Sequence, residues 1–352
     1  MDTITVLDGG VADVEATVDD RGRVLVAPAD LDTATGWDLK PEGLCRGDVC
    51  VPVRERSLVE PAGDGAGVDL AAVARALDRP VVVDLDGGVV ALGAARHQRR
   101  DALAGGPAPE LALPDVDGSA VALEDLRGTK AVLVAFATWC GCREDLPGWQ
   151  ALRDEVGADR LAVIPVALDE DPEDVRPFAE QVDLPVLVDR EHRMADVFGV
   201  SNVPAAVWID EDGRVARPPT VAFGTDVWKD FHGVPAGPHL EALKHWVATG
   251  EVPEGQANEA AGGVGTDVGD LSEDEAEARL WFRIAAHLRR QGRSEEAAER
   301  FERARALAPH DFTVARAAMP LTGRDPFGQE FLDLYADWQA AGSPFHGLEP
   351  DR

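Results

Sequence analysis

The spacing of apolar and polar positions changes along the chain, and each stretch predicts a different kind of structure. Residues 1–105 contain short apolar runs bounded by turn residues such as Asp86-Gly87-Gly88, a pattern typical of strands. An amphipathic stretch over residues 70–77 and a run ending in a glycine pair, residues 94–106, predict two helices. The predicted strands are Ile4–Leu7, Val24–Val26, Val81–Leu85 and Val89–Leu92. We therefore predict a small α+β domain over residues 1–106.

From residue 107 the pattern becomes a regular alternation of buried strands and helices. Continuous apolar runs predict the strands, and a hairpin turn is expected at Asp117-Gly118. The predicted strands cover residues 131–137, 161–168, 184–189, 205–210 and 214–218, and the predicted helices cover residues 143–157, 172–182 and 240–249. This strand–helix order implies a mixed sheet covered by helices on both faces, so residues 107–250 are predicted to form an α/β domain.

The rest of the chain combines an acidic, glycine-rich segment with a helical one. Residues 251–275 have almost no large apolar side chains and are predicted to be a linker. Residues 276–352 have helical periodicity, and their first two helices resemble a single tetratricopeptide repeat (TPR). One repeat cannot bury its own apolar face, so a further helix over residues 327–340 would complete it. We favour a helical cap on the core or on a second subunit over a peptide-binding groove. The TPR-like positions are Trp281, Ala285, Leu288, Gly292, Ala297, Phe301, Ala304 and Pro309.

Composition and charge narrow the functional classes. The 352 residues are 45% hydrophobic and 28% charged, as in an ordinary globular protein, and the formal net charge is −31. This charge argues against nucleic acid and anionic membranes as partners, because both bind basic patches. The N-terminus lacks the pattern of a signal peptide and no apolar run has the length of a membrane span, so we expect a cytoplasmic protein. Its thiols would be reduced there, and closely spaced cysteines would be catalytic or metal-binding.

Four features of residues 107–248 carry a resemblance to a known family. They are the hairpin region 108–128, the segment AVLVAFATWC at residues 131–140, the spacing from Cys142 to Pro147, and the segment GVSNVPAAVWIDEDGRV at residues 199–215. In this order along the chain they resemble the thioredoxin superfamily, in its ResA/TlpA-like branch. The resemblance implies a thioredoxin-like mixed sheet flanked by helices, and Trp139 stacked beside the cysteines. It also implies a cis peptide at Pro204, with Val203 lining the edge that aligns a substrate.

The cysteine motif departs from the family pattern in two ways. The usual Cys-x-x-Cys spacing is one residue short, and Val134 occupies the position of the acid that thioredoxin buries on this strand. The sequence FATWCGC is similar to a subgroup of ResA-like proteins with a selenocysteine-Gly-Cys motif, in which Cys140 takes the selenocysteine position. Because selenocysteine is used where a strong nucleophile is needed, this resemblance favours a working redox pair over a decayed one.

The spacing of Cys140 and Cys142 restricts where the pair can lie. In a helix, side chains two residues apart point to nearly opposite faces. In a strand, their Cα atoms are roughly 6.5 Å apart, near the upper limit for a disulfide. The junction of a strand and a helix suits the pair if the residue between them takes an unusual φ, which Gly141 is free to do. We therefore predict Cys140 in the loop after the strand and Cys142 at or just before the first turn of the helix.

This placement predicts the chemistry of the two thiols. Unpaired N–H groups at a helix start lower the pKa of a nearby thiol, and Arg143 would add to this effect, whereas Glu144 and Asp145 would oppose it. Cys140 is predicted to be the attacking thiolate and Cys142 the resolving thiol. Because the disulfide ring is one residue smaller than usual, we predict a relatively oxidising couple. A measured reduction potential as low as about −270 mV would contradict that prediction.

Cys45 and Cys50 form a second pair of cysteines. A hairpin would make them a second dithiol that reduces or resolves the first, but separate buried thiols are the commoner state of cysteine and are favoured. A structural zinc needs four ligands, and no other Cys or His lies near this pair in sequence. No metal or other cofactor is predicted, since the histidines of the central domain also lack metal-ligand spacing. These are His192, His232, His239 and His245.

Two further features have alternative interpretations. Asp169 and Glu170 follow a predicted strand and would serve as proton-handling acids near the cysteines, but an exposed strand end is favoured. Residues 222–240 replace the short connection of a minimal thioredoxin fold, and their aromatic side chains would either wall a pocket or cover the core, of which core cover is favoured. These aromatic residues are Phe223, Trp228 and Phe231.

The leading functional hypothesis is a thiol–disulfide oxidoreductase, or a thiol-dependent peroxide reductase, with Cys140 as the nucleophile. Its substrate would be a disulfide-bearing protein or a peroxide, and its reductant a cytosolic thiol. The peroxidase version draws on the selenocysteine likeness alone, because Leu133 and Ala137 occupy the Pro and Thr positions of the peroxiredoxin motif. A redox-inert binding module, docking a partner or a second copy through the C-terminal helices, is the alternative. Cu(I) capture by the thiol pair is a third hypothesis.

Overall fold

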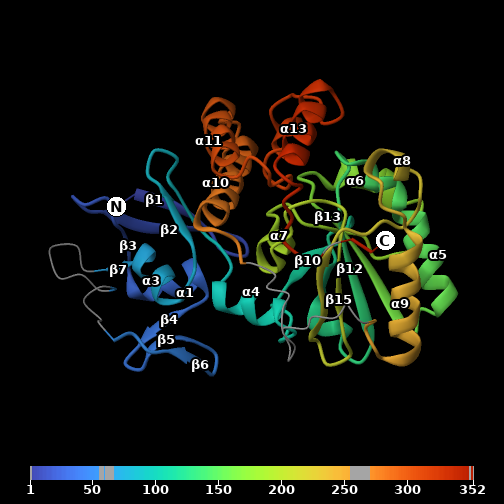
Figure 1. Ribbon diagram of the computed structural model, residues 1–352. Coiled ribbons are helices and arrows are strands. Elements are labelled where there is room, and N and C mark those ends of the chain that lie inside the picture. Colours follow the sequence, from blue (N-terminus) through green and yellow to red (C-terminus); the bar gives the residue numbers. More distant parts are fainter. Residues whose placement is uncertain (1, 55–58, 60–66, 254–269, 349, 352) are drawn as a thin grey trace. The chain divides into compact units, whose positions relative to one another are not determined.

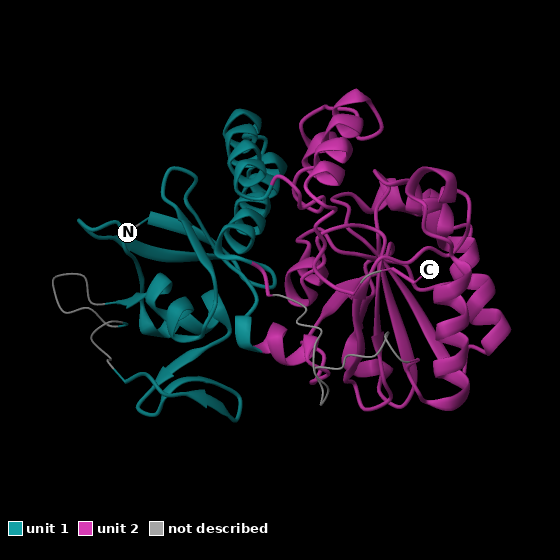
Figure 2. Cartoon of the chain, viewed as in Figure 1, with its two compact units in different colours: residues 1–97, 272–308 teal, residues 98–271, 309–352 magenta. Residues whose placement is uncertain are grey.

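The computed structural model describes the protein over residues 2–54, 59, 67–253, 270–348 and 350–351. The chain divides into two compact units (Figure 2). Unit 1 contains residues 1–97 and 272–308, and unit 2 contains residues 98–271 and 309–352. Each unit therefore joins segments that are far apart in the sequence.

The predicted domain boundaries differ from this division. The sequence analysis placed residues 98–106 with the N-terminal domain and residues 276–352 in one helical segment, whereas the structure assigns residues 98–106 to unit 2 and splits the helical segment after residue 308. Most of the predicted linker lies outside the described residues, and its end is helical because Ser272 and Glu275 form a capping box. Helical periodicity shows that a helix forms, but not which surface it covers.

Unit 1 is built on a six-stranded sheet with the order β7-β3-β2-β1-β9-β8 (Figure 1). Strand β1 pairs in parallel with β9 and antiparallel with β2. The sequence analysis did not predict strand β2. The strands are β1 (Asp2–Leu7), β2 (Val11–Val18), β3 (Val24–Val26), β7 (Val68–Asp69), β8 (Val81–Asp84) and β9 (Val89–Leu92). Apolar side chains of this sheet pack with those of α1 (Leu31–Thr35), which follows the short 3-10 helix η1 (Pro28–Asp30), and of α3 (Leu70–Ala76) in one core.

A small second sheet of unit 1 carries the first two cysteines. Its order is β4-β5-β6, with β4 (Asp38–Lys40), β5 (Gly43–Arg46) and β6 (Val49–Val51). The β5–β6 hairpin sets Cys45 directly opposite Cys50. Leu44, next to Cys45, is fully buried in the core of unit 1.

Two later helices, α10 (Glu273–Arg290) and α11 (Ser294–Leu307), complete unit 1. Helix α10 is buried along most of its length, and its Arg283 donates hydrogen bonds of 2.8 and 3.2 Å to the carbonyl groups of Leu92 and Leu7. Arg300 of α11 forms an ion pair with Asp84 at the end of β8. The helix pair belongs to unit 1 because these contacts join it to the sheet of that unit. The TPR-like character of the pair stays a prediction.

Unit 2 confirms the predicted mixed α/β sheet. Its order is β14-β13-β12-β15-β16, in which β12, β13 and β14 are parallel and the last two strands are antiparallel. The strands are β12 (Lys130–Phe136), β13 (Leu161–Ala167), β14 (Leu187–Val188), β15 (Ala205–Ile209) and β16 (Val215–Thr220). The predicted hairpin precedes them as β10 (Ala112–Pro114) and β11 (Ala120–Ala122), and a 3-10 helix, η2 (Leu123–Leu126), follows it.

Helices cover the sheet of unit 2. Figure 1 shows α5 and α9 side by side, and the buried Trp149 of α5 and Trp246 of α9 share a core with Trp208 of β15. The helices of this part are α4 (Arg96–Leu103), α5 (Leu146–Val156), α6 (Pro172–Ala179), α7 (Arg193–Phe198), α8 (Lys229–His232) and α9 (Gly237–Thr249). None of the helices in the described part of the chain has the length and apolar character needed to span a bilayer.

The last residues of the chain return to unit 2. They form α12 (Ala318–Leu321) and α13 (Gln329–Ala340), and Leu348 then forms an isolated bridge with Thr220 at the edge of the sheet. Near the chain end, Asp351 accepts hydrogen bonds of 2.9 and 2.7 Å from the buried guanidinium of Arg217. The C-terminal residues are therefore part of the folded unit that contains the cysteine motif.

Candidate active site

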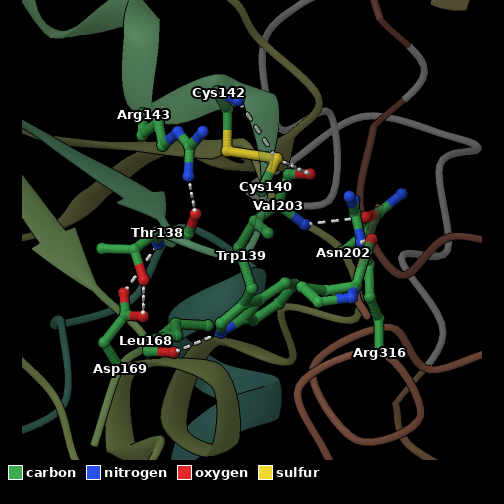
Figure 3. The surroundings of a disulfide bond; sticks show 11 residues. Thr138, Trp139, Cys140, Cys142, Arg143, Leu168, Asp169, Asn202, Val203 and Arg316 are labelled. Carbon is green, nitrogen blue, oxygen red and sulfur yellow. Dashed lines mark hydrogen bonds between the residues drawn. A yellow bond between two sulfur atoms is a disulfide. The ribbon is translucent and has the colours of Figure 1, made fainter. Parts of the chain in front are cut away.

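The cysteine motif lies between strand β12 and helix α5. After the strand ends at Phe136, the chain enters a 3-10 helix, η3 (Gly141–Asp145), which leads into α5. Cys140 is the N-cap of η3, and its Sγ accepts a hydrogen bond of 3.2 Å from the backbone N–H of Cys142. The two cysteines form a disulfide, with their Cα atoms 5.2 Å apart (Figure 3). The structure thus confirms the predicted placement, a loop cysteine followed by a cysteine in the first turn.

Gly141 is a glycine for a different reason from the one predicted. Its φ is not positive, so the expected unusual backbone conformation is wrong. Instead, the indole of Trp228 lies over it, and a Cβ at this position would be 2.8 Å from Nε1 and 2.9 Å from Cε2 of that ring. Close approach of an aromatic side chain, not backbone freedom, excludes larger residues here.

The segment before β15 faces the disulfide. The Val203–Pro204 peptide is cis, as predicted. The Sγ atom of Cys140 lies 3.6 Å from the carbonyl oxygen of Val203. Asn202, which the sequence analysis did not single out, accepts a hydrogen bond of 2.8 Å from the N–H of Val203 through its side chain. A backbone edge therefore lies directly beside the cysteine that was predicted to attack.

Two predicted supporting residues hold the cysteine loop from within. Trp139 is buried and donates a hydrogen bond of 3.0 Å from Nε1 to the carbonyl group of Leu168, after β13. Arg143 donates a hydrogen bond of 2.6 Å to the carbonyl group of Thr138 (Figure 3), and its guanidinium carbon lies 5.0 Å from the ring centre of Phe327. Arg143 therefore binds the backbone of the loop, and its assistance to the thiolate stays a prediction.

Asp169 is not at an exposed strand end, and the favoured interpretation was wrong. Strands β12 and β13 are parallel and end at the same edge of the sheet, so the residues that follow them meet. The carboxylate of Asp169 accepts hydrogen bonds of 2.9 Å from the N–H and 2.5 Å from the hydroxyl group of Thr138, two residues before Cys140. Burial raises the pKa of Asp169 to about 6, although the bonds from Thr138 oppose this shift.

The raised pKa of Asp169 predicts a pH-dependent effect of Asp169→Asn on stability. Since burial raises the pKa from 3.8 to about 6, the charged carboxylate is a destabilising group above pH 6, by on the order of 3 kcal/mol. The asparagine variant should be more stable than wild type at pH 7.5, and the difference should shrink as the pH falls through 6 towards 4. Urea unfolding at several pH values measures this; a difference that does not depend on pH would contradict it.

Residues 222–236 dock on the start of α5. Asp145 accepts hydrogen bonds of 2.9 and 2.5 Å from the N–H and hydroxyl groups of Thr225, and burial raises its pKa to about 6. A Cβ on Gly148 would collide with the carbonyl oxygen of Gly224. The core-cover interpretation holds for Phe223, which is buried, but not for two other aromatic residues. Trp228 and Phe231 are 41% and 48% exposed.

Gly141→Ala is predicted to displace Trp228 from the cysteine loop. The added methyl group occupies the space of the indole, so we expect lower stability, by about 1–3 kcal/mol, and a changed tryptophan emission. Trp228→Ala should remove the clash, and the double variant should be more stable than the sum of the single effects predicts. Additive effects in this double-mutant cycle would show that the indole is not the obstacle.

The structure also places the remaining predicted residues. Cys45 and Cys50 form a disulfide with Cα atoms 4.1 Å apart, so the favoured interpretation as separate thiols was wrong. The cause is the β5–β6 hairpin register, which the apolar pattern did not show. His239 donates from Nδ1 to Asp351 at 2.9 Å, because its Nε2 accepts from Trp208. No cluster of three or more His, Cys, Asp or Glu suited to a metal ion occurs among the described residues.

The C-terminal segment supplies residues of the site that the sequence analysis missed. Phe312 donates a backbone hydrogen bond of 2.8 Å to Ser201, which lies just before the cis peptide. The guanidinium carbon of Arg316 lies 5.8 Å from the ring centre of Trp139. More than 100 positions separate these residues from their partners, so no local pattern could have connected them.

Known proteins resemble the part of the chain that carries this geometry. The model of the AhpC/TSA family matches residues 104–217. The thioredoxin-like protein YneN of Bacillus subtilis is 36% identical over 117 residues, which are 32% of this chain and 68% of that protein. The chain belongs to the thioredoxin-like family. The thiol-disulfide oxidoreductase ResA of Geobacillus thermodenitrificans is 29% identical over 143 residues, 40% of this chain and 78% of that protein.

A solved structure is also similar to this thioredoxin-like chain. It is a putative thiol:disulfide interchange protein DsbE from Chlorobium tepidum, 32% identical, with a TM-score of 0.30, and the match covers 32% of this chain and 80% of that one. The thioredoxin-like part of the chain is therefore similar in sequence to a protein named as a thiol-disulfide oxidoreductase. The match with YneN covers 32% of this chain, and the residues matched by the family model, 104–217, belong to unit 2.

Proposed function

We propose that Cys140 is the nucleophile and Cys142 the resolving thiol of a thiol–disulfide oxidoreductase. The observation that carries the assignment is the position of the Cys140 Sγ, 3.6 Å from the Val203 carbonyl group that precedes the cis-proline. The backbone edge of residues 202–204 would align an extended substrate so that its disulfide meets Cys140. The N–H of Cys142, which donates to this sulfur, would stabilise the thiolate in the reduced protein.

The reaction proceeds in two exchanges. The Cys140 thiolate attacks one sulfur of the substrate disulfide, forms a mixed disulfide and releases the other sulfur as a thiolate. Cys142 loses its proton and attacks the Cys140 sulfur, which releases the second substrate thiolate and leaves the Cys140–Cys142 disulfide. An external thiol, for which we propose a cytosolic reductant, returns the protein to the dithiol. Trp139, buried beside Cys140, would limit access of water to the mixed disulfide.

The experiment that tests this function follows the reduction of insulin by the pre-reduced full chain, with dithiothreitol as the reductant. We expect reduction well above the rate with dithiothreitol alone, and oxidation of two thiols of the Cys140–Cys142 pair per protein in single-turnover conditions. Mass spectrometry after alkylation would show which cysteines are oxidised. A rate equal to that of dithiothreitol alone would favour the redox-inert binding module instead.

Peroxide reduction is a second candidate function because the matching family model is that of AhpC/TSA. The peroxiredoxin positions for Pro and Thr are occupied by Leu133 and Ala137, both buried and without side-chain hydrogen-bond donors. Disulfide exchange is therefore the better-supported activity. Hydrogen peroxide, supplied in place of insulin in the same assay, distinguishes the two, and an antioxidant role depends on that result.

The Cys45–Cys50 pair supports a further proposal. Cys50 is exposed and Cys45 is buried, so an attacking thiol reaches the pair through Cys50. We assign it as a second dithiol that exchanges with the Cys140–Cys142 disulfide. In the Cys45→Ser/Cys50→Ser variant, dithiothreitol should re-reduce the remaining disulfide more slowly than in wild type; an unchanged rate would make the second pair structural.

A further inference from the structure

Arg316 lies beside the cysteine motif because the C-terminal segment is fixed against the cis-proline loop. Phe312 donates a backbone hydrogen bond of 2.8 Å to Ser201, and the carbonyl group of Thr313 lies 3.0 Å from Nδ1 of His192. These contacts bring the Arg316 guanidinium to 5.8 Å from the ring of Trp139, the residue that precedes Cys140 (Figure 3).

The guanidinium of Arg316 is buried without a carboxylate. The residue is only 6% exposed, and its Nε donates a hydrogen bond of 3.1 Å to the carbonyl group of Pro326. Its other neighbours are aromatic: the ring of Phe331 at 3.6 Å, of Phe327 at 5.4 Å and of Trp139. Among the described residues, no carboxylate lies within ion-pair distance of it. Burial lowers the pKa of Arg316 to about 9, which leaves it charged at neutral pH.

Other buried arginines of unit 2 differ in this respect. Arg217 pairs with both oxygens of Asp351, and Arg99 pairs with Asp270 at 2.6 Å. Pairing is the usual arrangement, because a buried charge without a counter-ion destabilises the folded protein. Aromatic rings offset part of that cost through cation–π contact, but they leave the terminal N–H groups of the fork without a strong acceptor.

The guanidinium group of Arg143 lies near Phe327, as the guanidinium group of Arg316 does. The carbon atoms of the Arg143 and Arg316 guanidinium groups are 5.0 and 5.4 Å from the ring centre of Phe327, which is 44% exposed. Arg143 bonds to a backbone carbonyl group and, among the described residues, has no ion pair either. Two guanidinium groups therefore lie against Phe327 near the cysteine motif, whose neighbourhood also contains the carboxyl groups of Glu144, Asp145 and Asp169.

We propose that Arg316 binds a carboxylate of the substrate, close to the disulfide that Cys140 attacks. The site selects disulfides that carry an anionic group a few bonds from the sulfur, as in a small dicarboxylic disulfide or in a polypeptide with Asp or Glu beside its cysteine. The guanidinium fork suits a carboxylate because it donates two parallel hydrogen bonds to the two oxygens. This proposal rests on the proposed function and names its substrate class.

The test compares two disulfides of equal size, 3,3′-dithiodipropionate and its uncharged diamide. Each oxidises the pre-reduced full chain, and the second-order rate constant is divided by that of the same disulfide with 2-mercaptoethanol, which corrects for intrinsic reactivity. We expect wild type to prefer the dicarboxylate by about tenfold, the effect of one charge-assisted hydrogen-bonded pair. Arg316→Gln should lose this preference and retain its rate with the diamide within about twofold, whereas Arg316→Lys should keep part of the preference.

The matched control is Arg324→Gln, which removes one positive charge from the same segment at a residue paired with Glu330, and should leave the preference unchanged. An equal loss with both disulfides, or an unchanged preference in Arg316→Gln, would make the arginine purely structural and overturn the proposal. A wild-type protein that neither disulfide oxidises would instead refute the oxidoreductase function itself. The same comparison with disulfide-bridged peptides bearing Glu or Gln beside the cysteine identifies the source of the carboxylate.

Discussion

Cys140→Ser is expected to abolish disulfide reduction, with a loss on the order of 10³-fold or more in the second-order rate constant. The serine hydroxyl is not ionised near neutral pH and cannot form a disulfide with the substrate, so the first exchange has no nucleophile. Insulin reduction by the full chain measures the effect. The Cys45→Ser/Cys50→Ser variant is the matched control in a single turnover of the pre-reduced protein, because it keeps the Cys140–Cys142 pair and that measurement needs no re-reduction.

Cys142→Ser should stop the reaction after the first exchange. Cys140 still attacks, but no thiol is available to release the mixed disulfide, so a covalent adduct accumulates. Non-reducing electrophoresis with a disulfide-bearing protein, or mass spectrometry with a small disulfide, detects it. If Cys140→Ser formed the stable adduct and Cys142→Ser did not, the roles of the two cysteines would be reversed, although the function would stand.

Asp351→Asn is predicted to lower the free energy of unfolding by about 3–5 kcal/mol, because it leaves a buried guanidinium without its counter-ion. Arg217 is 1% exposed and binds both carboxylate oxygens of Asp351, and a third bond comes from His239. Chemical denaturation of the full chain measures the loss. Asp183→Asn is the control: its carboxylate is 97% exposed where it pairs with Arg153, so its removal should cost less than about 1 kcal/mol.

The effect of Asp351→Asn should depend on pH in a defined direction. Burial alone would raise the pKa of Asp351, but the hydrogen bonds from His239 and Arg217 outweigh it and hold the pKa well below its usual range. A lowered pKa in the folded protein gives stability that is present above the unfolded value of about 3.9 and is lost as the pH falls through the folded one. The difference from wild type should be constant between pH 5 and 8 and shrink below about pH 4; a loss that begins near pH 6 would point to His239 instead.

The local pattern of apolar and polar residues was sufficient to predict most of the fold of unit 2. Strands β12, β13 and β15 are continuous apolar runs, and Pro147 lies in the first turn of α5 after the cysteines, so both element type and order follow from neighbouring residues. The same holds for the position of Cys140 and Cys142, since two cysteines one residue apart suit only the junction of a strand and a helix. In unit 1, by contrast, the predictions omitted β2 and the β4–β5–β6 sheet, whose strands carry few buried apolar residues in alternation.

Residues that are close in the chain, or motifs in a recognisable order, were therefore enough to predict the thioredoxin-like sheet, the position of the cysteine pair and the cis peptide before Pro204. The side chains that surround the pair became known only from the folded structure. Trp228 lies over Gly141, Asp169 bonds to Thr138, and Arg316 reaches the ring of Trp139. The two residues of each contact are separated in the sequence by between 31 and 177 positions. Periodicity shows which face of an element is buried, but not which distant side chain covers that face. For this reason the sequence predicted that Gly141 is needed for its backbone conformation, whereas the structure shows that it is needed to make room for Trp228.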